Sequence, residues 1–223
     1  MFVLIHLLIV LLTVPSQSPT ATQEPTQSWL HPADAAYRRA IQDGFSGEAK
    51  TGPYNEGKDG IHQVWFNFTT SRSKNNAIIF FSPLRCAQLL GLDARQKLAD
   101  SPTVEAVRKL CDGNVFVTVN YSTRQRANSF PLVLEHEGVT IRPPRVDFQG
   151  SPNISTHWNG FSNDYTYSYG AIFNFNLTQP WTKDVNLRYV VPEDGNPLSE
   201  KIDLSVFAKD EQTYEGASRP EDK

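Results

Sequence analysis

Apolar and polar residues alternate along most of the chain from Ile61 onward. Val64, Phe66 and Phe68 fall on one side of this pattern, and further predicted strands span residues 115–121, 132–134, 139–141, 165–175, 185–191 and 202–206. Residues 77–81 are apolar at every position, which suits a central strand covered on both faces. Side chains two residues apart lie on the same face of a strand, so this period predicts half-buried β-strands. About eight or nine short strands with turn residues between them predict a mostly β fold, an antiparallel β-sandwich that is immunoglobulin-like in general architecture.

Helical spacing replaces the alternation between the second and third predicted strands. Apolar residues recur three or four positions apart over residues 84–112, with Gly91 as a possible break between two helices. Ser101 has the side chain of a helix N-cap, and Pro102 suits the first helical position. The pattern predicts a short helical insert in the β-sandwich. A further short helix is expected near the start of residues 29–60.

Composition shifts along the chain predict its organisation. Residues 2–14 are almost continuously apolar, the following residues are rich in Ser, Gln, Thr and Pro, and the last residues are polar. The predicted parts are a signal peptide (1–18), a flexible polar spacer (19–28), a short helix and loop (29–60), the β-sandwich domain with its insert (61–209) and a disordered tail (210–223).

The apolar N-terminal run predicts export. It is shorter than the roughly 20 apolar residues that span a bilayer, and small residues follow it, as in a cleaved signal peptide. An uncleaved anchor is the alternative. Cleavage would leave a chain without stable membrane insertion, in a periplasmic or extracellular location.

Two cysteines fit an exported chain. In an oxidising compartment an even number of cysteines most simply forms disulfides, so Cys86 and Cys111 are predicted to pair across the ends of the helical insert. The alternative is two buried free thiols. Their spacing matches no metal or redox motif.

Charge and motifs exclude several functions. The net charge of −3 gives no attraction to nucleic acid. The sequence contains no nucleophile-elbow GxSxG, no HExxH zinc motif and no phosphate-binding glycine loop. His136, between two glutamates in a predicted hairpin loop, is expected to be solvated rather than a metal ligand. No cofactor or metal is therefore expected, and a non-catalytic protein is favoured over an enzyme.

The segment 157–177 is the strongest candidate for a binding surface. Tyr165 shares its strand face with four further aromatic residues, and Trp158 and Phe161 lie in the Asn- and Gly-containing loop before it. Such a stripe most simply forms the core face of a strand. Exposed aromatic rings beside amide side chains would instead bind sugars or peptides. The candidate ligand-binding residues are therefore Trp158, Phe161 and Tyr165.

Four segments match the N-glycosylation acceptor Asn-x-Ser/Thr. Their asparagines are Asn67, Asn120, Asn153 and Asn176. The motif is short enough to occur by chance, and it has a consequence only in a cell that glycosylates its secreted proteins.

Three functions remain compatible with the sequence. The first is an exported, non-catalytic module that binds another protein or assists an assembly, through a partner that the sequence does not identify. The second is a carbohydrate-binding module that uses the aromatic residues of 158–169. The third is a secreted hydrolase with a carboxylate pair such as Asp147 and Asp164.

Overall fold

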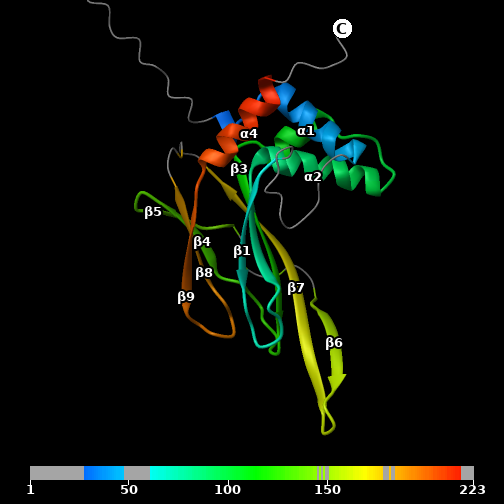
Figure 1. Ribbon diagram of the computed structural model, residues 1–223, viewed down its shortest axis with the longest axis vertical. Helices are drawn as coiled ribbons and strands as arrows, with labels where there is room; N and C mark the ends of the chain where they lie inside the picture. The colour runs from blue at the N-terminus through cyan, green and yellow to red at the C-terminus, as the bar shows by residue number, and fades with distance from the viewer. Residues whose placement is uncertain are drawn as a thin grey trace, which may run out of the picture.

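The computed structural model describes residues 28–47, 61–144, 146, 148, 151–177, 181 and 184–216. This part of the chain contains two antiparallel β-sheets and four α-helices (Figure 1). The predicted signal peptide and residues 19–27 of the predicted spacer lie outside the described residues, as does most of the predicted loop before Ile61. The two β-sheets confirm the predicted mostly β fold.

The larger sheet has five strands, all antiparallel to their neighbours. Their order is β1 (Gln63–Phe68), β2 (Asn76–Phe81), β3 (Asn114–Thr123), β7 (Asn163–Asn176) and β6 (Asn153–Trp158). The longest strand, β7, lies between β3 and β6, so the sheet edges are β1 and β6. The face of this sheet that shares a hydrophobic core with the smaller sheet is called the core face, and the opposite face is called the outer face.

The smaller sheet has four antiparallel strands. Their order is β5 (Val139–Ile141), β4 (Leu132–His136), β8 (Val185–Val190) and β9 (Pro197–Ile202). The β4–β5 hairpin turns at Glu137 and Gly138, which both have positive φ. The predicted four-residue loop is therefore a two-residue turn, and His136 belongs to β4, where it is buried and stacks on Trp181. The prediction of a solvated His136 is wrong.

One hydrophobic core joins the two sheets. Val117, Val119 and Tyr121 of β3 contribute to it, together with Leu134 of β4 and Leu187 of β8. Alternate residues of β4 and β8 are buried, as the two-residue period predicts, whereas β3 is buried on both faces over residues 114–117. The immunoglobulin-like sandwich stays a prediction.

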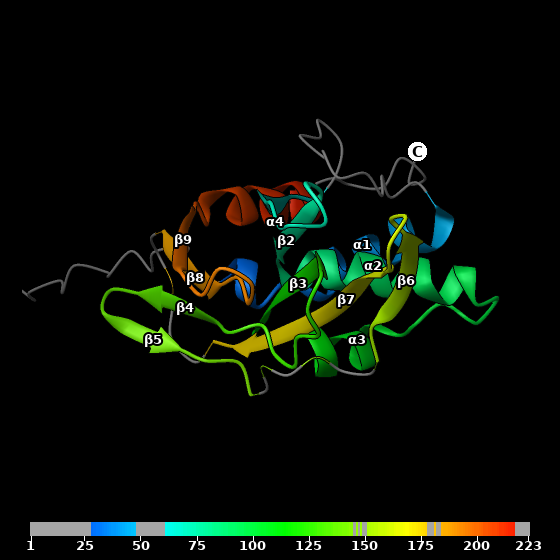
Figure 2. The same ribbon diagram turned by 90° about the horizontal axis from the view of Figure 1, so that it is seen from below.

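The helices form a layer with a core of its own at one end of the five-stranded sheet (Figures 1 and 2). The elements are the 3-10 turn η1 (Ser28–Leu30) and the helices α1 (Asp34–Ser46), α2 (Pro83–Gln96), α3 (Val104–Cys111) and α4 (Ser205–Gly216). Phe81 and Phe116, on the outer face of the sheet, belong to this second core. Helices from both ends of the described chain thus cover part of the outer face.

Two glycines set the contact between α1 and α2. A Cβ atom on Gly44 would collide with the backbone oxygen of Gln88, and one on Gly91 would collide with that of Ile41. Gly91 therefore lets two helices approach closely rather than splitting one helix. Thr103 instead of Ser101 caps α3, because its side chain accepts a hydrogen bond from the Ala106 N–H at 3.2 Å.

The predicted disordered tail is wrong over residues 210–216, which belong to α4. Tyr214 is buried and donates a hydrogen bond to Asp43 at 2.7 Å. Asp210 is buried and accepts from the His62 N–H at 2.7 Å, while the His62 ring lies 2.5 Å away. Burial raises the pKa of Asp210, and the bonds from His62 oppose that rise. These tertiary contacts hold a segment whose own composition predicts disorder. Residues 217–223 lie outside the described part.

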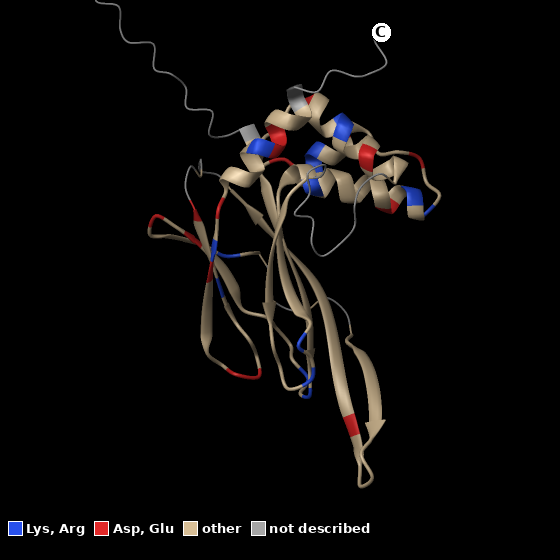
Figure 3. Ribbon diagram, in the orientation of Figure 1, with Lys and Arg blue, Asp and Glu red and all other residues tan. Residues whose placement is uncertain are grey.

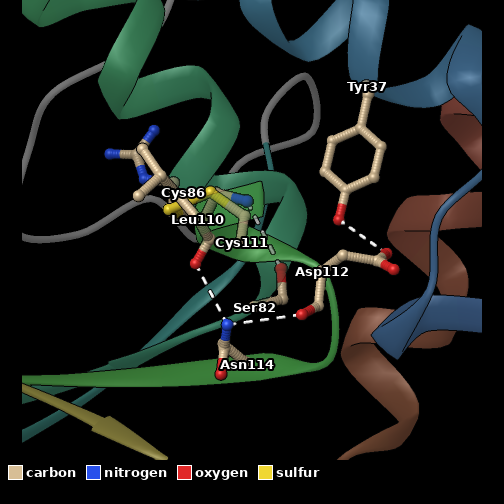
Figure 4. Close-up of a disulfide and its surroundings, with 8 residues drawn as sticks. Tyr37, Ser82, Cys86, Leu110, Cys111, Asp112 and Asn114 are labelled. Atoms are coloured by element: carbon tan, nitrogen blue, oxygen red, sulfur yellow. Dashed lines mark hydrogen bonds between the residues drawn. A yellow bond between two sulfur atoms is a disulfide. The ribbon is translucent and has the colours of Figure 1, made fainter. Parts of the chain in front are cut away.

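A disulfide between Cys86 and Cys111 confirms the predicted pairing (Figure 4). It joins α2 to α3, with 6.1 Å between the two Cα atoms. Beyond α3, Asp112 accepts a hydrogen bond from the Tyr37 hydroxyl at 3.2 Å, and Asn114 donates to the Leu110 carbonyl at 3.0 Å (Figure 4). Together these contacts fix α3 to α1, α2 and the start of β3.

Glu193, which follows β8, ties the two sheets together. Its carboxylate accepts hydrogen bonds from the Ser71 N–H at 2.9 Å, the Arg124 N–H at 3.1 Å and the Thr123 hydroxyl. Partial burial raises the pKa of Glu193, but the bonds from Thr123, Ser71 and Arg124 outweigh this effect and bring the pKa to about 2. The ionised carboxylate is the form that the fold stabilises.

Stability should therefore fall in acid through Glu193. Because its folded pKa lies below the unfolded value of 4.5, its contribution is fully present above about pH 4.5 and is lost as the pH falls toward 2. We expect Glu193→Gln to lower the free energy of unfolding by about 1–2 kcal/mol at pH 7, less at pH 2.5, allowing for partial solvent exposure. Urea unfolding at both pH values measures this difference. An equal loss at both would contradict the assignment.

Candidate functional site

The β6–β7 hairpin extends beyond the rest of the five-stranded sheet (Figure 1). The pairing of β3 with β7 ends at Tyr167, whereas β6 pairs with β7 from Asn163 to Ser168. Residues 153–167, named here the hairpin arm, therefore lie at the free end of β7. All six residues of β6 are exposed.

The aromatic stripe of β7 passes from the core to solvent along the strand. Phe173 and Tyr169 are buried, Tyr167 is partly buried against the core, and Tyr165 is 45% exposed. The regular alternation places all of them on the core face of the sheet. The two interpretations of the stripe therefore apply to different parts of it: core at the base and exposed surface on the arm.

Apolar side chains from both strands share the exposed end of that face. Ile154 lies opposite Tyr167, Thr156 opposite Tyr165 and Trp158 opposite Asn163, so the even-numbered residues of β6 lie on the core face. Ile154 is 59% exposed and Trp158 is 61% exposed. The face that is covered by the second sheet at its base is thus uncovered on the arm.

The tip of the arm is fixed by one side chain. Oδ1 of Asn159 accepts hydrogen bonds from the N–H groups of Phe161 and Ser162, both at 3.0 Å, and Gly160 supplies the positive φ that this turn requires. Phe161 is one of the residues of this turn, and its side chain is 94% exposed. A local hydrogen-bonded turn therefore presents an aromatic ring to solvent.

The arm carries little charge (Figure 3). Asp164 is the single Asp, Glu, Lys or Arg residue of the arm, and it forms an ion pair with Arg72 of the β1–β2 turn. The ion pair braces the arm against the neighbouring hairpin. Asp164 is one of the two carboxylates proposed for a hydrolase, and the ion pair engages it. The other carboxylate, Asp147, lies outside the described residues.

The part of the chain that the structure describes contains no side-chain cluster suited to a metal ion. Among these residues, no group of three or more His, Cys, Asp or Glu side chains could hold a metal ion. None of the helices described is long and apolar enough to span a bilayer.

Comparisons with protein-family models, with curated proteins and with solved structures find no match. The structure brings the predicted residues Trp158 and Tyr165 onto one face and sets Phe161 at the adjoining tip.

Sequence reasoning missed two hollows on the sheets. One, of about 640 Å³, lies on the four-stranded sheet, where Arg188 pairs with Glu135 at 2.7 Å beside the exposed Arg142. The other, of about 310 Å³, lies on the five-stranded sheet and is lined mainly by Asn and Ser side chains. Strand register assembles both from distant segments, and no local sequence signal marks either.

The four glycosylation motifs share one face. By strand register, Asn67, Asn120, Asn153 and Asn176 all lie on the outer face of the five-stranded sheet, and all four are exposed. The outer face is therefore rich in amide side chains, in contrast to the aromatic core face.

Proposed function

We propose that this chain is an exported, non-catalytic module that binds a partner protein through the hairpin arm. The observation that carries the proposal is the uncharged, exposed surface formed by Ile154, Trp158, Phe161 and Tyr165 on a braced hairpin. Exposed aromatic residues of this kind commonly supply much of the binding energy at protein interfaces, since they bury large apolar areas in pockets of a partner.

The proposed setting and scaffold suit such a role. The apolar N-terminal run and the disulfide are compatible with export to a periplasmic or extracellular location. We infer that the two sheets face each other as a β-sandwich, since their buried side chains form one cluster. Such a scaffold would hold the arm at a fixed angle, which lowers the entropy lost on binding.

The carbohydrate alternative on the arm rests on Trp158, whose exposed indole could stack on a sugar ring. Thr156 and Asn163 lie beside Trp158 on the same face and could hydrogen-bond a sugar, but the other large exposed side chains of the arm, Ile154, Phe161 and Tyr165, are mainly apolar. A protein pocket fits this apolar surface better. The hydrolase gains no support, because Asp164 is held by Arg72.

Site-specific photo-crosslinking tests the proposal in the producing cells. We expect a photoreactive residue at position 161 to give a defined crosslinked product, and one at position 155, on the other face of the arm, to give none. Trp158→Ala should abolish the product while leaving the free energy of unfolding within about 0.5 kcal/mol of wild type, because the side chain is exposed. Equal labelling from both positions, or none from position 161, would reject the arm as the docking site.

A further inference from the structure

The hollow on the outer face of the five-stranded sheet has a neutral, polar lining. Its volume is about 310 Å³, which lies at the small end of the range for ligand sites. The side chains that border it on this face come from Asn75, Asn120, Ser122, Asn153 and Ser168, around Gly170. Asn76, which pairs with the core residue Phe68, also contributes to the lining. Tyr121 and Tyr169 complete the lining, but their side chains lie on the core face. No charged residue contributes.

Gly170 keeps this hollow open. It lies inside β7, opposite Asn120, and its φ is outside the left-handed region, so the backbone does not require glycine. A Cβ atom there would meet only Oδ1 of Asn120, at 3.7 Å, an ordinary contact. Glycine in a strand interior weakens the strand and often marks a place where a ligand approaches the backbone closely. Neither packing nor conformation explains Gly170, but the hollow does.

Three amide side chains around Gly170 are free to bind. Asn75, Asn120 and Asn153 are exposed, and within the described residues none of their side-chain amides makes a hydrogen bond. They come from the β1–β2 turn, β3 and β6, so the fold gathers them from three separate segments. Each amide offers both donors and an acceptor.

The wall behind these amides is fixed. The Asn76 amide donates to the Ser73 carbonyl at 2.9 Å and its oxygen accepts from the Ser122 N–H at 2.8 Å. The hydroxyls of Ser122 and Ser168 lie 3.0 Å apart and hydrogen-bond to each other. The hollow is thus pre-formed, which reduces the ordering cost of binding.

We propose that this hollow binds a neutral saccharide of one or two sugar rings. Sugar hydroxyls both donate and accept hydrogen bonds, which matches amides and hydroxyls and requires no charge. Ile172 lies two residues from Gly170 on the same face and is 63% exposed, so it can contact the C–H face of a sugar ring. This site lies on the outer face of the sheet, away from the apolar surface of the arm, with which it shares only the arm residue Asn153, and it does not depend on the function proposed there.

A glycan array of neutral and acidic oligosaccharides, followed by calorimetry with the strongest neutral saccharide, tests the proposal. The protein should come from a host without N-glycosylation, so that Asn120 and Asn153 are unmodified. We expect a neutral saccharide to bind and Gly170→Val to weaken it at least tenfold, because the new side chain fills the hollow. Gly170→Val should still fold, since valine favours strands and a Cβ atom at this position meets no close contact.

Two matched variants locate the site. Asn120→Ala should weaken binding several-fold, whereas Asn174→Ala, on the same face but outside the hollow, should leave it unchanged. The proposal is overturned if no neutral saccharide binds, or if Gly170→Val binds as wild type does. Binding that is lost in Trp158→Ala but kept in Gly170→Val would overturn it too, and would assign the saccharide to the arm.

Discussion

Replacing Tyr169 with alanine should lower the free energy of unfolding by about 3–5 kcal/mol, the range for removing a large buried aromatic side chain. Its ring is 6% exposed and stacks on Phe148, with 4.3 Å between the ring centroids. Its hydroxyl oxygen also accepts a hydrogen bond from the Ala127 N–H at 2.7 Å. The substitution would leave both a cavity and an unpaired backbone donor, as urea unfolding should show.

Tyr165 provides the matched control on the same face of the same strand. Because it is 45% exposed, we expect Tyr165→Ala to change the free energy of unfolding far less than Tyr169→Ala does. Tyr167→Ala should lie between the two, and Thr166→Ala should be nearly neutral. Equal losses of unfolding free energy at positions 165 and 169 would show that Tyr165 is buried, which would contradict its 45% exposure.

Removing the disulfide should lower the free energy of unfolding by about 3 kcal/mol, the chain-entropy expectation for a loop of this size. Cys86 and Cys111 are 25 residues apart, and Cys111 is fully buried in the helical core. The double variant Cys86→Ala/Cys111→Ala avoids a leftover thiol. Its urea unfolding curve, compared with that of the oxidised wild type, measures the loss.

Reduced wild-type protein supplies the control for the cysteine variant. Its free energy of unfolding should agree with that of the double alanine variant to within the cost of the small packing change. If the reduced protein were as stable as the oxidised one, the bridge would contribute nothing to the fold. The loop-closure argument would then not apply to this helical layer.

The sequence predicted the features that depend on local pattern. The strands of the alternating segments, the helical stretch around residues 84–112 and the Cys86–Cys111 pairing all appear in the structure. It also selected Trp158, Phe161 and Tyr165, which share the arm. Alternation is local, so it identifies a strand face, but it cannot tell where along β7 that face leaves the core.

The features that the sequence did not predict depend on contacts between residues far apart in the chain. Asp210 and Tyr214 of α4 form hydrogen bonds with His62 and Asp43, which are distant in the sequence. No pattern near residue 210 predicts these contacts. His136 is buried because Trp181 stacks on it. The hollow around Gly170 needs the register of β3, β6 and β7, which periodicity does not supply. Tertiary context outweighs composition at all three places.

The position of α4 has a consequence for the order of folding. This helix is the last described element of the chain, yet it packs against α1, near the other end, and contributes Tyr214 to the helical core. A chain that emerges from its N-terminus first, as in synthesis or translocation, cannot complete that core until α4 has emerged. Until then Tyr37 and Ile41 of α1 lack part of their packing, so a nascent chain has an apolar surface that chaperones can bind.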